Sequence, residues 1–165
     1  MARPLRDKDP SLIRLITIRT EHAALWMVPS EALEELQGGI LARYQEIFGI
    51  EIFAYNFLGN HYHLLLRAPN QNLDEFEECV NRESARRINL LNGRSGTFWS
   101  RRYDDQVVIE DADILEGLLY TVTNATKHGL VTNSRGWPGL NCYHQLLNEK
   151  PVKVSLLYSN KVCKV

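Results

Sequence analysis

The stretch EIFAYNFLGNHYHLLLR, residues 51–67, contains two apolar runs with only Gly59-Asn60 between them. Each run, Glu51–Leu58 and His61–Arg67, has the length and the composition of a β-strand. Glycine and asparagine both tolerate a positive φ, so a two-residue linker of this kind predicts a tight turn between antiparallel strands. We therefore predict a β-hairpin over residues 51–67 and assign the rest of the fold outward from it.

The segments before and after this hairpin alternate between strand-like and helix-like patterns. Residues 11–20, SLIRLITIRT, alternate between two faces and are rich in β-branched side chains, which predicts a strand. Ser30 is placed to cap a helix that would extend to about Phe48 and end at Gly49. Downstream we predict a helix over about 73–92, a strand ending in 106–109, and a helix over about 114–128 that is capped by Asp111 or Asp113.

The resulting order, β-α-β-β-α-β followed by one further helix, predicts an α+β protein with a ferredoxin-like fold. In that fold an antiparallel four-stranded sheet carries two helices on one face. Many unrelated functions use it, so the order of elements alone does not indicate the chemistry. The residues expected to face inward are Leu33, Leu36, Ile40 and Ile47 on the first helix, and Leu73, Phe76, Val80, Ile88 and Leu91 on the second.

The composition is that of one compact domain. The 165 residues are 44% hydrophobic, and 19 Lys plus Arg against 20 Asp plus Glu give a net charge of −1, which excludes a wholly basic, histone-like protein. No apolar run is long enough to span a membrane, and residues 1–10, expected to be an arm, contain no apolar core of a secretory signal. Cys79, Cys142 and Cys163 lack metal-ligand spacing, so we expect reduced thiols and a cytoplasmic protein.

His61 and His63 lie two residues apart on the second strand of the predicted hairpin. Residues two apart share one face of a strand and are separated by roughly 6.6 Å along it, so both imidazoles can reach one ion. Tyr62, Leu64 and Leu66 would then face the core. A pair of surface histidines is the alternative interpretation, because a His-x-His pattern alone is a weak signal.

The predicted helix over 114–128 carries a second group of polar residues. Ile114, Leu118, Val122 and Ala125 form its apolar stripe. On another face the helix presents a phenol, an amide, a cation and an imidazole, at Tyr120, Asn124, Lys127 and His128. A tyrosine with an ordinary pKa of about 10 is a poor nucleophile unless a cation or a base assists it, and Lys127 or His128 could do so. The alternative is a solvated face with one amphipathic tyrosine.

Residues 81–103 concentrate positive charge, with six arginines against Glu83 alone. The planar guanidinium group suits phosphate, and interleaved aromatic rings could stack on bases. A solvated helix face with a core tryptophan is the alternative, and the acidic run over 74–78 could pair with these arginines or remain at the surface. The candidate nucleic-acid-binding residues are Arg82, Arg86, Arg87, Arg94, Arg101, Arg102, Trp99 and Tyr103.

With these residues in place, the sequence resembles a known group of proteins. The run FLGNHYHLLLR, residues 57–67, is similar to the metal-binding motif of the HUH-superfamily single-tyrosine transposases, in the branch of the REP-associated tyrosine transposases. The segment Thr20–Ala24 departs from the basic, glycine- and asparagine-containing segment that many relatives carry there. The resemblance spans about residues 2–145. The similar segments within that span are residues 2–6, 57–67, 81–89, 96–103, 119–124, 129–131 and 137–138.

The resemblance implies a metal-dependent enzyme that cuts and joins single-stranded DNA, commonly near a hairpin. By position, His61, His63 and Asn124 would bind Mg²⁺ or Mn²⁺, and Tyr120 would form a 5′-phosphotyrosine intermediate. Imidazole ligands alone would suit Zn²⁺ at least as well, so the choice of ion rests on the resemblance. We expect a transposase domain over residues 1–145 and a tail over 146–165 whose role is not assigned.

Other functions stay open from the sequence. A non-catalytic or domesticated relative could bind structured single-stranded DNA or RNA without cutting it. A two-histidine phosphoesterase is excluded, because none of the five histidines is followed two positions later by Ser or Thr. The DNA target, and whether the protein is a monomer or a homodimer, are not decided by these residues.

Overall fold

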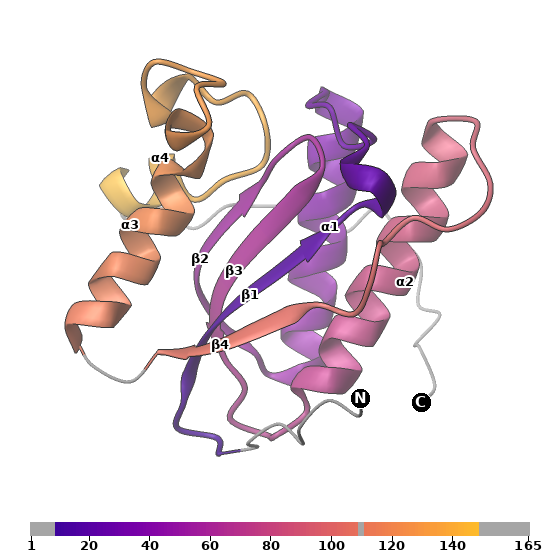
Figure 1. The fold of residues 1–165 in the computed structure, drawn as a ribbon. Coiled ribbons are helices and arrows are strands. Elements are labelled where there is room, and N and C mark those ends of the chain that lie inside the picture. Colours follow the sequence, from indigo (N-terminus) through magenta and orange to yellow (C-terminus); the bar gives the residue numbers. More distant parts are fainter. Residues whose placement is uncertain (1–8, 109–110, 149–165) are drawn as a thin grey trace.

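The computed structural model describes residues 9–108 and 111–148. Four antiparallel strands form one sheet in the order β2-β3-β1-β4 (Figure 1). The strands are β1 (Ile13–Arg19), β2 (Glu51–Phe57), β3 (His61–Arg67) and β4 (Asp104–Val108). Residues 1–8 of the predicted arm, Ile109 of the predicted last strand, and residues 149–165, including Cys163, lie outside the described residues.

Helices cover both faces of this sheet. The helices α1 (Glu31–Phe48) and α2 (Leu73–Leu91) lie on one side, and α3 (Asp111–Lys127) lies on the other (Figure 1). The ferredoxin-like order and the added helix are therefore confirmed. Two 3₁₀ turns, η1 (Glu21–Ala23) and η2 (Ser134–Gly136), and the short α4 (Tyr143–Asn148) are the other elements of the described residues. Within the described residues, no helix combines the length and the hydrophobicity needed to cross a membrane.

The ends of α1 form as the sequence predicts. The Leu33 backbone N–H donates to Ser30 Oγ over 3.3 Å, which satisfies one of the N–H groups at the start of the helix. Gly49 ends the helix in the left-handed conformation, with φ of 64°. The apolar stripe was misassigned at Ile47, which is 46% exposed. With 3.6 residues per turn the buried face continues through Tyr44 and Phe48 instead.

On α2 the prediction for Leu91 is likewise wrong, because this side chain, the last of the helix, is 49% exposed. The remaining predicted inward residues of α1 and α2 are buried. The burial pattern therefore follows the predicted periodicity except in the last turn of each helix.

The predicted hairpin forms, but its turn has a different conformation from the one expected. Neither Gly59 nor Asn60 has a positive φ. A Cβ built on Gly59 would lie 3.0 Å from Leu25 Cδ2. Glycine at this position therefore lets the turn pack closely against the segment that follows β1, although the exposed Leu25 side chain could move to accept a Cβ.

The alternation of side chains divides the sheet into two chemically different faces. Ile16, Ile18, Tyr62, Leu64 and Leu66 pack in the core beneath α1 and α2. The opposite face combines apolar and polar groups: Leu65 packs in a smaller cluster with Val122 of α3, while His61 and His63 are buried on the same face because they share its parity.

The segment before α4 lies along the outer edge of β2. The Phe57 N–H donates to Leu140 O over 2.8 Å, and the Cys142 N–H donates to Tyr55 O over 3.1 Å. These bonds satisfy backbone groups that an edge strand would otherwise expose. The helix α4 continues across the domain boundary that we predict at residue 145, so that boundary does not coincide with the end of an element.

β4 begins at Asp104 and includes residues 106–108 of the stretch 106–109 in which the predicted strand ends. Asp105 is brought opposite Ile16 of β1, where Arg14 Nη1 contacts Asp105 Oδ2 at 2.9 Å. Each of these side chains is only 5% exposed. A neutralising partner from another strand thus allows a carboxylate to enter the sheet.

We predict that Arg14→Met lowers the free energy of unfolding by about 3–5 kcal/mol, because it leaves the Asp105 carboxylate buried without this partner. The double variant Arg14→Met/Asp105→Leu should recover most of the loss, since it removes both charges. Urea denaturation followed by circular dichroism measures both values. A double variant no more stable than Arg14→Met would contradict the role assigned to the pair.

Candidate active site

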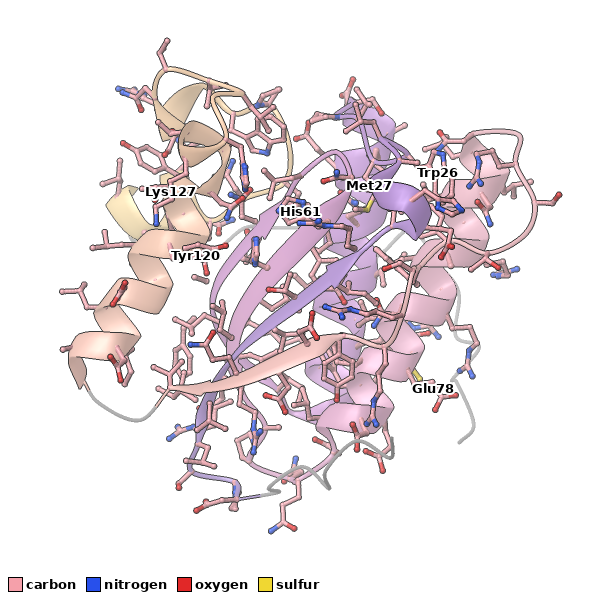
Figure 2. The ribbon with its side chains drawn as sticks, viewed as in Figure 1. Trp26, Met27, His61, Glu78, Tyr120 and Lys127 are labelled. Atoms are coloured by element: carbon pink, nitrogen blue, oxygen red, sulfur yellow. The ribbon has the colours of Figure 1, made fainter. Side chains whose placement is uncertain are left out.

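The helix α3 lies along β3 so that successive helical turns meet alternate strand residues. A Cβ on Gly117 would lie 3.4 Å from Leu65 Cδ1. One turn later, the Tyr120 ring packs edge-on against His63, with ring centroids 5.2 Å apart. At the end of the helix, the centroid of the His128 ring is 5.8 Å from that of His61. Figure 2 shows Tyr120 and Lys127 on α3 and His61 on β3.

A buried amide fixes the position of α3 on the sheet. Asn56 Nδ2 donates to the backbone carbonyl of Thr121 over 2.9 Å, and both residues are buried. Asn56 lies directly opposite His63 in the pairing of β2 with β3. Asn56 is therefore both the cross-strand neighbour of His63 and the residue that holds the helical turn containing Tyr120.

The two histidines are close and shielded. Their ring centroids are 4.9 Å apart with an interplanar angle of 87°. His61 is 6% exposed and His63 is 3% exposed. His61 Nδ1 lies 2.6 Å from Asn60 Oδ1, and His63 Nδ1 lies 2.7 Å from Thr17 Oγ1. Because an amide oxygen can only accept, His61 Nδ1 must carry the proton in this hydrogen bond. Nε2 of the neutral ring then keeps its lone pair.

The turn after β1 holds Asn60 in the orientation that this bond needs. Asn60 Nδ2 donates to Ala23 O over 3.0 Å, and the Thr20 N–H donates to Asn60 O over 2.8 Å. His22 and Ala23 both have a positive φ, at 54° and 53°. Non-glycine residues adopt this conformation at a cost, so the turn is strained where it contacts the hairpin.

Both histidines are held in the neutral form. Burial lowers the pKa of His61 to about 4, with the nearby charge of Arg19 adding to the effect and Asn124 opposing it. Burial also lowers the pKa of His63 to about 3, assisted by His61, His128 and Arg19. Neutral imidazoles carry the lone pairs that a metal ion requires.

Four buried polar atoms at this site have no hydrogen-bond partner in good geometry among the described residues. They are His63 Nε2, Asn56 Oδ1 and both polar side-chain atoms of Asn124, a fully buried residue. Buried polar atoms are nearly always satisfied, so an unpaired set in one place is suited to bind a ligand or an ion. Two imidazoles and an amide oxygen fit a divalent cation chemically. Among the described residues, no cluster of three or more His, Cys, Asp or Glu residues is placed to bind a metal.

Tyr120 is half-buried and has a cation close by. Lys127 Nζ lies 4.6 Å from the centroid of the Tyr120 ring, and both Lys127 and His128 are exposed. Tyr120 also borders a cavity of about 450 Å³ between α3 and the strands β1 and β4. Its lining includes Thr17 and the acidic residues Asp113 and Glu116.

The structure does not gather the predicted arginines at this site. Arg82, Arg86 and Arg87 belong to α2, on the opposite side of the sheet from α3 (Figure 1). Arg86 is exposed, and Arg94 stacks on Trp26 with Cζ 3.3 Å from the ring centroid. The other four form ion pairs: Arg82–Glu78 (3.1 Å), Arg87–Glu83 (2.7 Å), Arg101–Asp104 (2.5 Å) and Arg102–Asp74.

The predicted aromatic residues are part of the core. Tyr103 is 4% exposed and its hydroxyl donates to Asp74 Oδ1 over 2.5 Å. The structure therefore contradicts a base-stacking role for Tyr103, because its ring is covered. Trp99 is half-buried, with Nε1 donating to Asn81 O over 2.9 Å, and it packs against Phe98.

Comparison with known proteins assigns the chain to a family. The family model described as "Transposase IS200 like" matches residues 26–113, a range that includes both histidines. The chain belongs to the IS200-like transposase family. The matched range begins after β1 and ends before Tyr120 and Asn124, so the family assignment rests on α1, α2, the strands β2, β3 and β4, and the histidine pair. A search of curated protein sequences finds no match.

Two solved structures have a similar fold. A REP-associated tyrosine transposase bound to a REP hairpin aligns with a TM-score of 0.74 and 16% identity, over 100% of this chain and 95% of that chain. A protein from Deinococcus radiodurans described as a transposase aligns with a TM-score of 0.50 and 20% identity, over 70% of this chain and 92% of that chain. At these identities the likeness concerns the fold alone.

The sequence did not reveal the residues that support the histidines. Thr17, Asn60 and Asn56 were not identified as members of the site, although each contacts a histidine or the helix opposite. Thr17 had a detectable signal, since it is a polar residue on the same face of β1 as the apolar Ile13 and Leu15. Its partner could not be identified without the pairing of β1 with β3.

We predict that Thr17→Val weakens Mn²⁺ binding about tenfold, because the bond that orients His63 is lost while the side-chain volume is kept. Titration followed by electron paramagnetic resonance of free Mn²⁺ measures the affinity. Thr123→Val is the matched control, since the Thr123 hydroxyl only donates to Leu119 O within α3. Equal affinities for the Thr17 and Thr123 variants would contradict the role given to Thr17.

Proposed function

We propose that this protein is a DNA strand transferase that forms a covalent bond between Tyr120 and a phosphodiester of single-stranded DNA. Membership of the IS200-like transposase family indicates DNA-cleaving activity in general terms. The tyrosine, the metal and the hairpin are our specific additions. The observation that supports them is the contact of Tyr120 with His63 at a site whose buried polar atoms lack partners.

The reaction balances as a transesterification. The Tyr120 oxygen attacks phosphorus, a new O–P bond forms, and the bond to the 3′ oxygen breaks. The phenolic proton passes to solvent and the leaving 3′ oxygen takes up a proton from solvent, so the products are a 5′-phosphotyrosine and a free 3′-OH. Because the phosphodiester energy is conserved, a second 3′-OH can reverse the step and join strands.

The residues around Tyr120 have separate proposed roles. His61, His63 and Asn124 would hold Mg²⁺ or Mn²⁺, which when bound polarises the phosphate and neutralises charge that develops on it. Lys127, above the Tyr120 ring, favours the negative phenolate oxygen in the attack. His128, exposed beside His61, is a second candidate for support.

The proposed DNA partner is a single strand that contains a hairpin. One similar structure is of a transposase bound to a REP hairpin, which is the basis for extending that partner to this chain. We also propose the domain limits of residues 1–145 for this activity. Binding of structured DNA without cleavage is the outcome that the following experiment separates from the proposal.

We predict that wild-type protein incubated with hairpin-containing single-stranded oligonucleotides and Mn²⁺ forms a denaturant-resistant DNA adduct, and that Tyr120→Phe forms none. Gel electrophoresis in denaturant detects the adduct. Tyr143→Phe is the control, because Tyr143 is half-buried at the start of α4 and packs against the ring of His144. DNA binding by wild type without any adduct would favour the non-catalytic alternative.

We predict that Lys127→Gln slows adduct formation about tenfold at saturating DNA, and that Lys127→Arg keeps most of the rate. The cation stabilises the attacking oxygen, so the charge matters more than the identity of the side chain. Single-turnover kinetics with excess protein measure the rate. A Lys127→Gln rate equal to that of wild type would exclude this role for Lys127.

A further inference from the structure

We propose that Arg19 is a catalytic residue whose guanidinium binds the phosphodiester that Tyr120 attacks. Arg19 is outside the arginine-rich stretch of the sequence, and it is the last residue of β1. The inference rests on the proposed function, because it places a DNA phosphate beside the histidine pair. It adds a phosphate-binding group that belongs to the sheet rather than to α3.

The pairing of β1 with β3 sets the position of Arg19. Arg19 lies directly opposite His61, and Thr17 lies directly opposite His63. Residues opposite each other in antiparallel strands project from the same face, with Cβ atoms about 5 Å apart. The Thr17–His63 contact identifies that face as the one beneath α3. The Cβ of Arg19 is therefore next to that of His61, and the side chain is long enough to extend over the candidate metal ligands.

The guanidinium of Arg19 is available to a ligand. Arg19 is exposed and makes no side-chain hydrogen bond or ion pair within residues 9–108 and 111–148. This contrasts with Arg82, Arg101 and Arg102, each of which is paired with a carboxylate. The charge of Arg19 is also felt at both His61 and His63, which agrees with its position beside them. An unpaired guanidinium beside neutral imidazoles is suited to an anionic phosphodiester.

The charges around Tyr120 indicate the side from which a phosphate approaches. The cavity between α3 and β4 is lined by Asp113 and Glu116, and these carboxylates repel a phosphate backbone. Lys127 lies on the opposite side of Tyr120 along α3, and Arg19 lies at the same end of the sheet as His61. A phosphodiester that avoids the acidic cavity therefore enters between Arg19 and Lys127.

Binding measurements without metal test the phosphate contact. Wild type, Arg19→Gln and Arg86→Gln are titrated with fluorescent hairpin-containing single-stranded DNA in EDTA over a series of salt concentrations. Arg86 is the matched control, since it is exposed and also makes no ion pair within the described residues, but belongs to α2 on the far side of the sheet. We expect Arg19→Gln, but not Arg86→Gln, to weaken binding about fivefold or more. The same variant should reduce the slope of the logarithm of the binding constant against the logarithm of the salt concentration by about 0.7.

Single-turnover rates at saturating DNA test whether the contact is to the reacting phosphate. We expect Arg19→Gln to slow adduct formation about tenfold or more, and Arg19→Lys to recover part of the rate. An unchanged salt slope, or a wild type that binds no DNA, overturns the phosphate contact. A reduced slope with an unchanged saturated rate overturns the assignment to the reacting phosphate.

The two proposals fail separately. A wild type that binds DNA with an Arg19-dependent slope but forms no adduct contradicts the proposed strand transfer and supports the phosphate contact. An adduct that depends on Tyr120 but not on Arg19 contradicts only the inference about Arg19. Far-UV circular dichroism of each variant verifies that the fold is kept, which is expected because Arg19 is exposed.

Discussion

The hydrogen bond from Asn56 Nδ2 to the Thr121 carbonyl is the contact on which the arrangement of this site depends. It joins the strand beside the histidines to the helix that carries Tyr120. A helical turn rises about 5.4 Å and two strand residues span roughly 6.6 Å, so one turn of α3 advances about as far as two residues of β3. Once Thr121 is fixed, Tyr120 meets His63, and Asn124, one turn later, comes beside His61. The ring of His128, two turns after Tyr120, also lies near that of His61.

The site is built at a cost to the fold. Each buried polar atom without a partner costs about 1–3 kcal/mol, and His63 Nε2 and the Asn124 amide are such atoms. The two histidines also occupy positions of β3 that apolar residues would fill more favourably, as Leu65 does on the same face. A ligand that satisfies these groups would stabilise the folded state. Conversely, the Arg14–Asp105 pair shows that the same sheet accepts buried charges elsewhere when their partner is supplied.

Local charge in the sequence was a poor guide to free charge on the surface. Residues 81–103 contain five more positive than negative side chains by formal count. The fold brings Asp74 against Arg102 and a tryptophan against Arg94, while Arg82 and Arg101 pair with carboxylates three or four positions away in the sequence. Arg19, which stands apart from the cluster in sequence, is the arginine opposite His61. Electrostatic complementarity to DNA is decided by this spatial pairing, because ion pairs form between neighbours in space.

The order of the elements, the caps of α1, the hairpin, and the shared face of His61 and His63 could be predicted from the sequence, because each depends on local periodicity or on residues a few positions apart. The same is true of the succession of Tyr120, Asn124 and Lys127 along one helix. The three-dimensional structure was needed to find that α3 covers the sheet face opposite α1 and α2, that Thr17 and Asn60 orient the histidines, and that Tyr103 is buried. These depend on strand pairing and helix packing between residues distant in the chain, which no pattern of neighbouring residues specifies.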